Sequence, residues 1–365
     1  MKIGFDARMI SNAGIGSYIS SLLTHMTKQS PDDNFILFGD PVRLACFEAE
    51  RNVKIVKWTA PIYTLREQIL PPPCFADMDV FHVPHFNIPL AFKNNMVVTI
   101  HDLIYLLIPE SHPSPLAKAY AGFFIKRALQ SSKSVIAVSN NTAEDLIKCF
   151  GTEYGGRIKV VYEGVGQSCG IDRDPSRMQL VREKYGLSEK IILYVGAVKP
   201  HKNVGALLKV YEMLRSWGIP HQLVICGRWD RKEDKLKGPV DTLGVKYLGE
   251  VSREDLGALY GMAETLVHLS LYEGFGLTLL EAMQCGTPVV TVRNSSIPEV
   301  VGDAALITEN NDIKCIADTV YNVLMSPEMR SKLSELGRKQ AAKFSWESAA
   351  ARTLAVYRAS IGQRA

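Results

Sequence analysis

Short apolar runs alternate with amphipathic helical stretches along the first half of the chain. Between the predicted strands, Ile19, Leu22, Leu23 and Met26 recur at helical spacing. Strands that alternate with helices indicate parallel sheets built from βα units. The apolar runs predict strands at residues 2–5, 35–38, 53–56, 80–83, 96–100, 134–138 and 158–162.

A mixed stretch from Gly164 to about Ser188 interrupts this pattern. It holds glycines, Cys169 and the charged run at residues 172–174, and it predicts a connection between domains with a short helix. The pattern then resumes, and a final helix is expected from Ser345. The fold class predicted is α/β, with two doubly wound domains. Strands are expected at residues 191–195, 222–226, 245–248, 265–269, 288–292 and 304–307, and helix caps at Ser139, Ser252 and Ser326.

Composition narrows the class of protein. A length of 365 residues suits two domains, and 47% hydrophobic with 22% charged residues indicates a globular chain. A net charge of +4 without a Lys/Arg run argues against nucleic acid as a partner. No uncharged apolar run reaches the roughly 18 residues of a membrane span. Seven cysteines without a C-x-x-C pair, and a first strand in place of a signal peptide, predict a cytoplasmic protein.

The stretch at residues 114–134 combines basic and aromatic side chains. A helix of this kind can lie on an anionic membrane, so peripheral contact with the membrane is one interpretation. Packing of the helix on its own domain, with ordinary surface lysines, is the favoured one. The residues concerned are Lys118, Tyr120, Phe123, Phe124, Lys126, Arg127, Leu129 and Lys133.

The most informative stretch is residues 272–283, which follows a predicted strand, passes through Gly274 and Gly276, and enters a helix at Leu277. Backbone N–H groups at such a helix start suit an anionic ligand. The carboxylates of Glu273 and Glu281 suit hydroxyl donors. A ligand with a phosphate near the N–H groups and hydroxyl groups near the carboxylates fits both features, which suggests a nucleotide sugar. Solvated charges at the start of a helix are the alternative interpretation of the two glutamates.

Two other strand ends carry similar loops. In the second domain Gly196 begins a loop with Lys199 and Lys202, which suit a diphosphate, although lysines in a solvated turn are common. In the first domain Gly14 and Gly16 follow the first strand and permit close approach of a ligand. This glycine pair lacks the third glycine and the acidic partner of a dinucleotide fingerprint, which argues against NAD(P).

His101 and Asp102 end a strand of the first domain, where a reactive group would be displayed. A histidine bonded to nearby backbone is an equally good interpretation. A metal site at His82, His85 and His101 is disfavoured, because their spacing matches no recognised pattern. The D-x-D sequences at residues 77–79 and 172–174 do not follow strands, and we expect no metal ligands there.

Together these motifs resemble the retaining glycosyltransferases of family 4. The resemblance covers nearly the whole chain and implies the GT-B architecture, two Rossmann-like domains with a cleft between them. It implies an acceptor-binding domain at residues 1–168, a linker with a nucleotide-sugar-binding domain at 169–345, and a final helix at 346–365 that returns to the first domain. Glu273-x7-Glu281 within Tyr-Glu-Gly-Phe-Gly is the most specific element.

The resemblance also implies roles for individual residues. Glu273 would contact hydroxyls of the transferred sugar, Glu281 would hold the ribose, and Lys202 would neutralise the diphosphate leaving group. His101 would lie near the reactive side of the sugar. The family commonly has a basic residue where this chain has Ala197, and Lys199 or His201 is expected to compensate. The other expected donor contacts are Gly14, Gly16, Gly196, Gly227, Arg228, Glu250, Val251, Gly274, Phe275, Gly276 and Leu277.

Residues 101–105 with Pro109 and Glu110 look similar to bacterial mannosyltransferase-like members that build surface polysaccharides. GDP-mannose is therefore the first donor expected, with UDP-sugars and dTDP-rhamnose open, and the acceptor a glycan or lipid-linked saccharide. No cofactor or metal is expected if Lys202 and a helix start supply the positive charge. A sugar-nucleotide epimerase and a non-catalytic nucleotide-sugar-binding subunit are the alternative functions.

Overall fold

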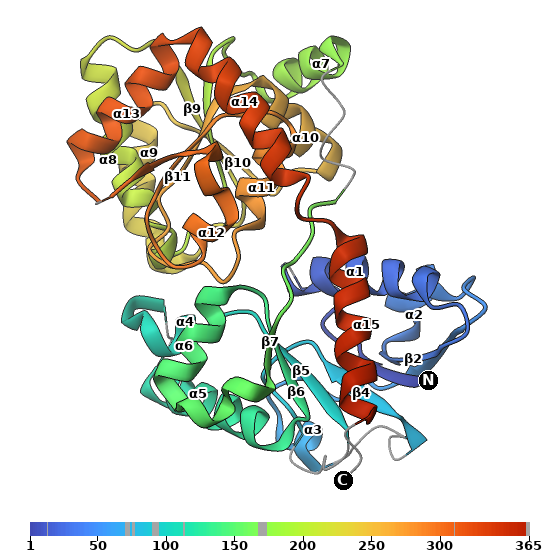
Figure 1. Ribbon diagram of the computed structural model, residues 1–365. Helices are drawn as coiled ribbons and strands as arrows, with labels where there is room; N and C mark the ends of the chain where they lie inside the picture. The colour runs from blue at the N-terminus through green and yellow to red at the C-terminus, as the bar shows by residue number, and fades with distance from the viewer. Residues whose placement is uncertain are drawn as a thin grey trace. The chain divides into compact units, whose positions relative to one another are not determined.

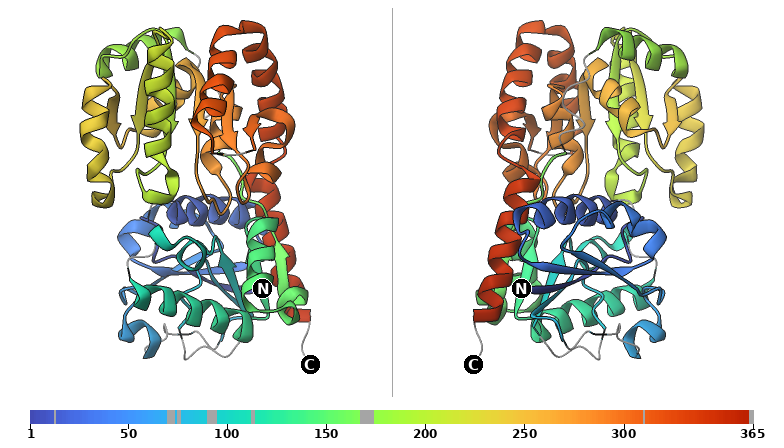
Figure 2. Two further views of the ribbon diagram at one scale, coloured as in Figure 1. Left: turned by 90° about the vertical axis from the view of Figure 1, so that its left-hand side faces the viewer. Right: turned by 90° about the vertical axis from the view of Figure 1, so that its right-hand side faces the viewer.

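The computed structural model describes residues 1–12, 14–69, 74, 77–89, 95–111, 114–166, 174–309 and 311–362. The chain forms two compact units, Met1–Gly164 with Ser345–Ala365, and Val165–Phe344. Each unit is an open parallel sheet with helices on both faces (Figures 1 and 2), so the predicted α/β class is confirmed. The predicted boundary between residues 168 and 169 lies outside the described residues, as do Cys169, Asp172 and Arg173.

The N-terminal unit contains a seven-stranded sheet in the order β3-β2-β1-β4-β5-β6-β7. The order reverses between β1 and β4, which is the switch point of a doubly wound sheet. Its central strands are apolar on both faces because helices cover both, as is usual for parallel sheets. The strands are β1 (Lys2–Asp6), β2 (Asn34–Gly39), β3 (Val53–Lys57), β4 (Val80–Val83), β5 (Met96–Ile100), β6 (Ser134–Ala137) and β7 (Ile158–Val160).

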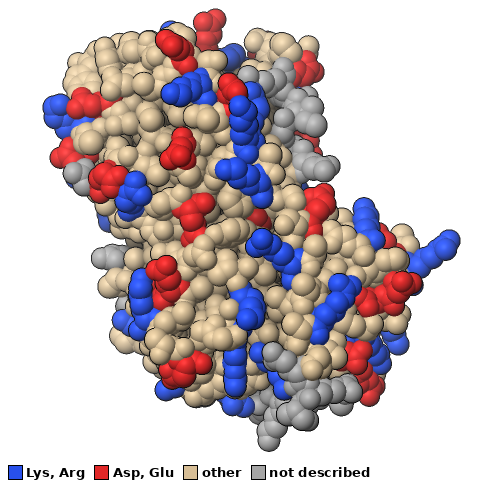
Figure 3. Space-filling model, viewed as in Figure 1, with Lys and Arg blue, Asp and Glu red and all other residues tan. Residues whose placement is uncertain are grey.

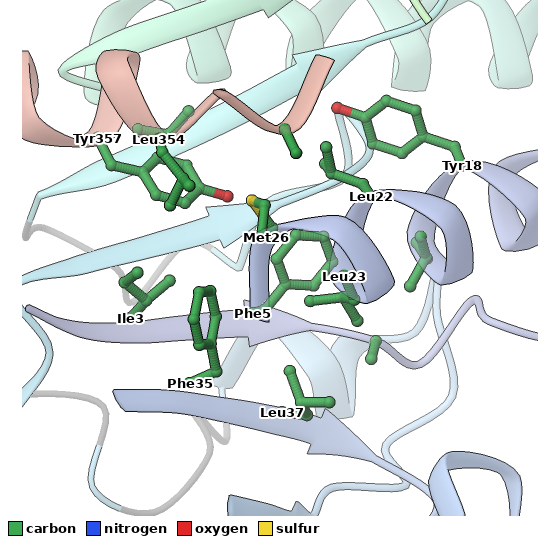
Figure 4. Packing of buried hydrophobic residues seen from close by; sticks show 14 of the residues in the cluster. Ile3, Phe5, Tyr18, Leu22, Leu23, Met26, Phe35, Leu37, Leu354 and Tyr357 are labelled. Atoms are coloured by element: carbon green, nitrogen blue, oxygen red, sulfur yellow. The ribbon is translucent and has the colours of Figure 1, made fainter. Parts of the chain in front are cut away.

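Alternate residues of these strands enter two separate hydrophobic cores. On one face β1 and β2 pack against α1 and α15, as Figure 4 shows at close range. On the other face Phe38, Phe81 and Ile100 pack against α5 and α6. The helices are α1 (Ile15–Gln29), α2 (Pro41–Leu44), α3 (Leu65–Ile69), α4 (Ile104–Leu107), α5 (Pro115–Ser131), α6 (Asn140–Phe150) and α15 (Trp346–Gly362), with 3₁₀ turns η1 (Ala45–Phe47), η3 (Pro109–Ser111) and η4 (Thr152–Arg157).

The last helix, α15, belongs to the N-terminal unit and runs beside α1 (Figure 1). Trp346, Leu354 and Tyr357 are buried in the core shared with α1. The hydroxyl of Tyr357 also lies 2.5 Å from Nδ1 of His82, a fully buried residue of β4. The chain therefore returns, after the whole C-terminal unit, to complete the first core.

The C-terminal unit contains a six-stranded sheet in the order β10-β9-β8-β11-β12-β13, with its switch point between β8 and β11. α8 and α13 pack on one face of it, and α11 and α14 pack against each other. The strands are β8 (Ile191–Val195), β9 (Gln222–Cys226), β10 (Lys246–Gly249), β11 (Ala263–His268), β12 (Val289–Val292) and β13 (Leu306–Thr308). The helices are α7 (Pro175–Tyr185), α8 (Val204–Ser216), α9 (Lys237–Thr242), α10 (Arg253–Met262), α11 (Leu277–Gln284), α12 (Ile297–Val301), α13 (Ile313–Met325) and α14 (Pro327–Ala341), with 3₁₀ turns η6 (Pro200–Lys202), η7 (Arg231–Leu236) and η8 (Gly302–Ala304).

The predicted serine caps are confirmed. Ser139, Ser252 and Ser326 accept hydrogen bonds from backbone N–H groups three residues on, and so open α6, α10 and α14. These bonds satisfy donors that a helix start leaves without an intrahelical partner. Proline in the first turn reinforces the start of α5, α7 and α14.

Charged side chains of both signs are interspersed over the face of the molecule shown in Figure 3. On α5 the predicted packing interpretation holds for one side of the helix, because Phe124 and Leu129 are buried. Phe123 is 56% exposed and Lys118 and Lys126 are exposed, so α5 also presents a basic, aromatic surface. Within the described part of the chain, no helix combines the length and apolar character needed to span a bilayer.

Candidate donor site

Two loops that flank the switch point of the C-terminal sheet carry the strongest candidate residues. One follows β8 and holds Lys199 and Lys202; the other follows β11 and holds Glu273. Because β8 and β11 are parallel neighbours, their carboxyl ends lie at the same edge of the sheet. This edge, at a switch point, is where open α/β sheets bind ligands.

The loop after β8 is tied to the loop after β9. The N–H of Gly196 donates to the carbonyl of Cys226, and the N–H of Val198 donates to that of Arg228, each at 2.9 Å. A β-carbon on Gly227 would come within 2.2 Å of the Gly196 oxygen, and Gly227 has φ +134°. Glycine is therefore required here by the close approach of the two loops.

The loop after β11 is held by two serines that follow β12. The backbone N–H of Glu273 donates to Ser295 Oγ at 2.7 Å. Ser296 Oγ lies 3.0 Å from the carbonyl oxygens of both Glu273 and Phe275. Phe275 itself is buried and packs edge-on against Phe344. The backbone of this loop is thus held by contacts that do not involve the side chain of Glu273.

One carboxylate oxygen of Glu273 receives two donors. Lys202 Nζ lies 2.6 Å from Oε1, and His268 Nε2 lies 2.7 Å from the same atom. Among the described residues the second oxygen, Oε2, has no hydrogen-bond partner, and the side chain is 11% exposed. Oε2 is therefore the atom with capacity to accept a ligand hydroxyl.

The two donors keep Glu273 ionised. Burial raises the pKa of its carboxyl group, but the charge of Lys202 and the hydrogen bond of His268 oppose burial and hold the pKa well below its ordinary value of 4.5. The structure brings together Lys202 and Glu273, which the resemblance assigned to the diphosphate and to the transferred sugar of one donor.

Glu281 lies one turn into α11, the helix that begins after Gly276, which has φ +103°. Its Oε2 accepts a hydrogen bond from the hydroxyl of Tyr260 at 3.0 Å. Burial raises the pKa of Glu281 above its ordinary value, although the Tyr260 bond opposes the shift. Leu277 is the first residue of the same helix, a position whose N–H group has no partner within the helix.

Lys199 and His201 are the two residues expected to replace the basic side chain that this chain lacks at Ala197. Burial, with the charge of Lys202, lowers the pKa of His201 to about 3, so this ring is neutral at physiological pH. Lys199 is exposed, and no carboxylate of the described residues forms an ion pair with it. His201 is therefore unsuited to replace the basic residue missing at Ala197, and Lys199 stays the candidate.

The loops after β9 and β10 contain the remaining expected donor contacts. Arg228 and Glu250 are exposed and Val251 is half-buried. Beside them, Trp229 packs edge-on against Tyr247 with ring centres 5.2 Å apart, and the Tyr247 hydroxyl donates to the Gly227 carbonyl at 2.9 Å. These loops lie at the same edge of the sheet as Glu273.

The expected residues of the first domain belong to the other unit. Gly14 precedes α1 with φ +74°, and the space where its β-carbon would stand is open. A β-carbon on Gly16 would come within 2.3 Å of the Ile10 carbonyl oxygen, so the fold itself requires glycine at this position.

His101 is held by oxygen atoms on both sides of its ring. Nδ1 lies 3.0 Å from a carboxylate oxygen of Glu163, and Nε2 lies 3.1 Å from the Pro84 carbonyl. Burial lowers the pKa of His101, but Glu163, Asp102 and the Pro84 carbonyl outweigh burial and raise it above 6.5. The Pro84 contact agrees with a histidine bonded to backbone, while the contact with Glu163 adds a side-chain partner that this interpretation did not include.

Sequence reasoning missed three contributors to this site. His268 stood in an apolar strand, and a histidine five residues before a glutamate was the available signal. Ser295 and Ser296 follow a predicted strand, but nothing in their spacing pointed to Glu273. Within the described residues no group of three or more His, Cys, Asp or Glu side chains could hold a metal ion.

Comparison with known proteins gives consistent results for both units. The family model described as Glycosyl transferases group 1 matches residues 179–340, and the model described as Glycosyltransferase Family 4 matches residues 22–167. The chain is 34% identical over 285 residues to O-antigen chain mannosyltransferase B of Escherichia coli, covering 76% of this chain and 74% of that protein. It is 30% identical over 264 residues to the O-antigen chain mannosyltransferase RfbU of Salmonella typhimurium, covering 71% and 69%.

Solved structures show the same architecture. HepE of Anabaena, in complex with UDP and glucose, matches with a TM-score of 0.75 and 19% identity over 98% of this chain and 100% of that chain. At this identity the likeness establishes the fold alone, which is the predicted GT-B fold of two Rossmann-like domains.

Proposed function

The chain belongs to glycosyltransferase family 4, and we propose that it is a retaining mannosyltransferase with GDP-mannose as donor. Its acceptor would be a glycan or lipid-linked saccharide in the synthesis of a cell-surface polysaccharide. The names of its relatives support mannose and this setting. The observation that carries the site is the cluster of Lys202, His268 and Glu273 at the switch point of the C-terminal sheet.

In this proposal the donor lies along the carboxyl edge of that sheet. Glu273 Oε2 accepts a hydroxyl of the sugar, and Glu281 accepts a ribose hydroxyl. The loops with Gly227, Arg228, Glu250 and Val251 receive the ribose and base. The N–H groups at the start of α11 face the diphosphate, together with Lys199 and Lys202, because a helix start and cations both favour an anion.

The reaction breaks the bond between C1 of the sugar and the diphosphate oxygen. An acceptor hydroxyl attacks C1 on the face from which the diphosphate departs, and its proton passes to the departing diphosphate. Charge builds on the leaving diphosphate, so Lys202, Lys199 and the α11 start stabilise the transition state more than the ground state. Because Lys202, Lys199 and the start of α11 would supply positive charge to the diphosphate, the reaction would not require a metal ion. His101 would lie on the reactive side of the sugar, with its ring orientation set by Glu163.

Two partners are also proposed. The acceptor would bind the N-terminal unit. The basic, aromatic surface of α5, with Phe123 exposed, would give peripheral contact with an anionic membrane at the cytoplasmic side.

The test begins with donor binding. We expect GDP and GDP-mannose to raise the melting temperature more than UDP, dTDP, ADP and their sugars, because a ligand of the folded state stabilises it. Transfer from the preferred donor should persist in EDTA, and proton NMR of the product should show the anomeric configuration of the donor retained. Inversion, loss of transfer in EDTA, or no stabilisation by any nucleotide would each reject the corresponding part of the proposal. Donor interconversion without an acceptor would indicate an epimerase instead.

A further inference from the structure

The N-terminal unit contains a pocket in which four of the eight described lining residues are aromatic. It has a volume of about 390 Å³, within the range of roughly 300–1,000 Å³ that is usual for small-molecule sites. Its walls come from three tyrosines, one phenylalanine and one leucine, with small residues of α5 between them. These five are Tyr63, Phe86, Tyr105, Leu116 and Tyr120.

The pocket lies at the ligand-binding edge of its sheet. Tyr63 follows β3, Phe86 follows β4, and Tyr105 stands in α4 directly after β5. Because all seven strands are parallel, these three loops emerge at one edge, where open α/β sheets bind ligands. The N-terminal unit thus has a pocket at the edge that corresponds to the donor site of the C-terminal unit.

A buried carboxylate fixes two of the aromatic walls. Glu67 is fully buried, and its Oε2 accepts the backbone N–H of Tyr63 at 2.9 Å and the side-chain amide of Asn87 at 2.5 Å. The Tyr120 hydroxyl donates to the oxygen of the same Asn87 amide. Tyr63 itself has φ +66°, a left-handed conformation that costs free energy in a residue with a side chain.

Arg8 holds Glu67 in place by an ion pair, at the carboxylate oxygen opposite the one that Tyr63 and Asn87 contact. Its Nη2 lies 2.7 Å from Glu67 and 2.6 Å from Asp6, and its guanidinium stands 3.4 Å above the ring of Trp58. Buried ion pairs add little to stability on average, so a buried cluster of this kind is better explained by positioning. The positioned groups are the backbone of Tyr63 and the ring of Tyr120, that is, two walls of the pocket.

The lining selects for a ligand that is neutral, flat on one face and hydroxylated at its edge. Among the described residues, no side chain that lines the pocket carries a charge, so a phosphate or carboxylate would lose water without gaining a counter-ion from them. Tyr63 and Tyr105 are 50% and 38% exposed, so part of each side chain is accessible to a ligand, and a tyrosine offers both an aromatic ring and a hydroxyl group. An alkyl chain would use the rings but not the hydroxyls; a sugar ring, with one C–H face and an edge of hydroxyls, uses both.

We propose that this tyrosine pocket binds one neutral sugar ring of the acceptor saccharide. The inference rests on the proposed function, because the acceptor is defined only if the chain transfers a sugar. It adds that the part of the acceptor next to the enzyme carries no phosphate, uronic acid or sialic acid. Tyr105 would stack on the sugar, and Glu67 would be a positioning residue that acts through Tyr63 and Asn87.

The probes for the test are the methyl glycosides of mannose, glucose, galactose and N-acetylglucosamine, with mannose 6-phosphate and methyl glucuronide as charged counterparts and decanol as an alkyl probe. Saturation-transfer NMR on the full chain measures their binding. We expect at least one neutral glycoside to receive saturation through its ring C–H protons, and the charged sugars and decanol to receive less. Tyr105→Ala should weaken glycoside binding by about tenfold, the scale of one aromatic contact of about 1.4 kcal/mol.

Matched variants distinguish the loss of a contact in the pocket from a general loss of folded structure. Tyr105→Phe keeps the ring and should retain most of the binding, whereas Phe123→Ala removes an exposed aromatic of α5 outside the pocket and should change nothing. No binding of any neutral glycoside, equal binding of the charged sugars, stronger binding of decanol, or full binding by Tyr105→Ala would each overturn the proposal. Failure of every nucleotide to bind would overturn the proposed function instead, and glycoside binding would still report on the pocket.

Discussion

The Nζ atom of Lys202 lies 2.6 Å from Oε1 of Glu273, so the cation proposed for the diphosphate contacts the carboxylate proposed for the sugar. Their side chains are 19% and 11% exposed, so removing one of the two charges would leave the other largely buried without a counter-ion. The pair sets the spacing between the two binding groups. It also means that neither residue can be changed without altering the charge of the other's surroundings.

Glu273→Gln should lower turnover by at least ~100-fold, the scale of removing one transition-state stabiliser. The amide keeps the size of the side chain but removes the charge that Lys202 and His268 contact. Steady-state transfer kinetics would measure the loss. Glu264→Gln is a suitable control, because Glu264 also contacts a histidine, His221, at 3.0 Å in the same unit but lies at the start of β11. If Glu273→Gln kept the same high activity as Glu264→Gln, the assignment of Glu273 to the donor site would be wrong.

The two lysines of the β8 loop should differ in effect. Lys202→Ala is expected to reduce turnover by at least ~100-fold, because it removes the cation that contacts Glu273 and is proposed to contact the diphosphate. Lys199→Ala should instead weaken nucleotide diphosphate binding several-fold and reduce its salt dependence, as expected of an exposed cation. Calorimetric titration of GDP at two salt concentrations would show this. Lys184→Ala, which breaks the 2.6 Å contact with Asp255 outside the site, serves as control.

The contact between His101 and Glu163 predicts a pH dependence of stability. Because the pKa of His101 is raised in the folded state, its protonation stabilises the fold fully below about pH 6.5, its ordinary pKa, and this contribution is lost as the pH rises through the raised value. Glu163→Gln should lower the pKa of His101 and flatten the free energy of unfolding above pH 6.5. NMR titration of the His101 ring and urea unfolding at several pH values measure the two effects. An unshifted His101 pKa in the variant would contradict the assigned cause.

Gly16→Ala should destabilise the N-terminal unit by roughly 1–3 kcal/mol, because the new β-carbon would meet the Ile10 carbonyl oxygen and the backbone must move. Gly156→Ala, in the same unit, places a β-carbon with no atom within 4 Å and should be nearly neutral. Thermal unfolding would compare them. If Gly16→Ala kept full stability but lost donor binding, Gly16 would be a ligand contact and not a packing requirement.

Membrane contact predicts a response to charge on α5. Lys118→Glu with Lys126→Glu should reduce binding to vesicles of phosphatidylglycerol and phosphatidylcholine by at least ~10-fold, since each basic residue near an anionic surface contributes about 1 kcal/mol. Lys314→Glu, on α13 of the C-terminal unit, is the control. Co-sedimentation at low salt measures the binding. If the unmodified chain fails to sediment with these vesicles, α5 is not a membrane surface.

The fold was largely predictable because parallel strands buried on both faces leave long apolar runs in the sequence. β8 and β9 begin and end at the predicted residues, and both are internal strands of their sheet. β10 and β13 differ by one or two residues at their ends. They are half-buried edge strands with a weaker apolar pattern, although the internal strand β11 also departs from its predicted bounds by up to two residues.

The site was predictable only in outline. Lys202 and Glu273 are 71 residues apart, and the rule that ligands bind at strand ends was enough to associate them. The contacts of Ser295 and Ser296 with the Glu273 loop depend on loop conformation, which no periodic pattern encodes. Asp255 donates its N–H group to the cap residue Ser252, and its carboxylate also receives Arg177, Lys184 and Tyr185 from α7, contacts that no spacing in the sequence indicated.

The position of α15 has a consequence for biosynthesis. A ribosome completes every strand of the N-terminal sheet early, yet Trp346, Leu354 and Tyr357, which cover that sheet, are translated only after the whole C-terminal unit. Until then the face of β1 and β4 that α15 covers, including His82, is left open to solvent. The nascent N-terminal unit therefore exposes an apolar surface for as long as the C-terminal unit takes to be made. Such a surface is a natural binding site for a chaperone and a point of vulnerability to aggregation.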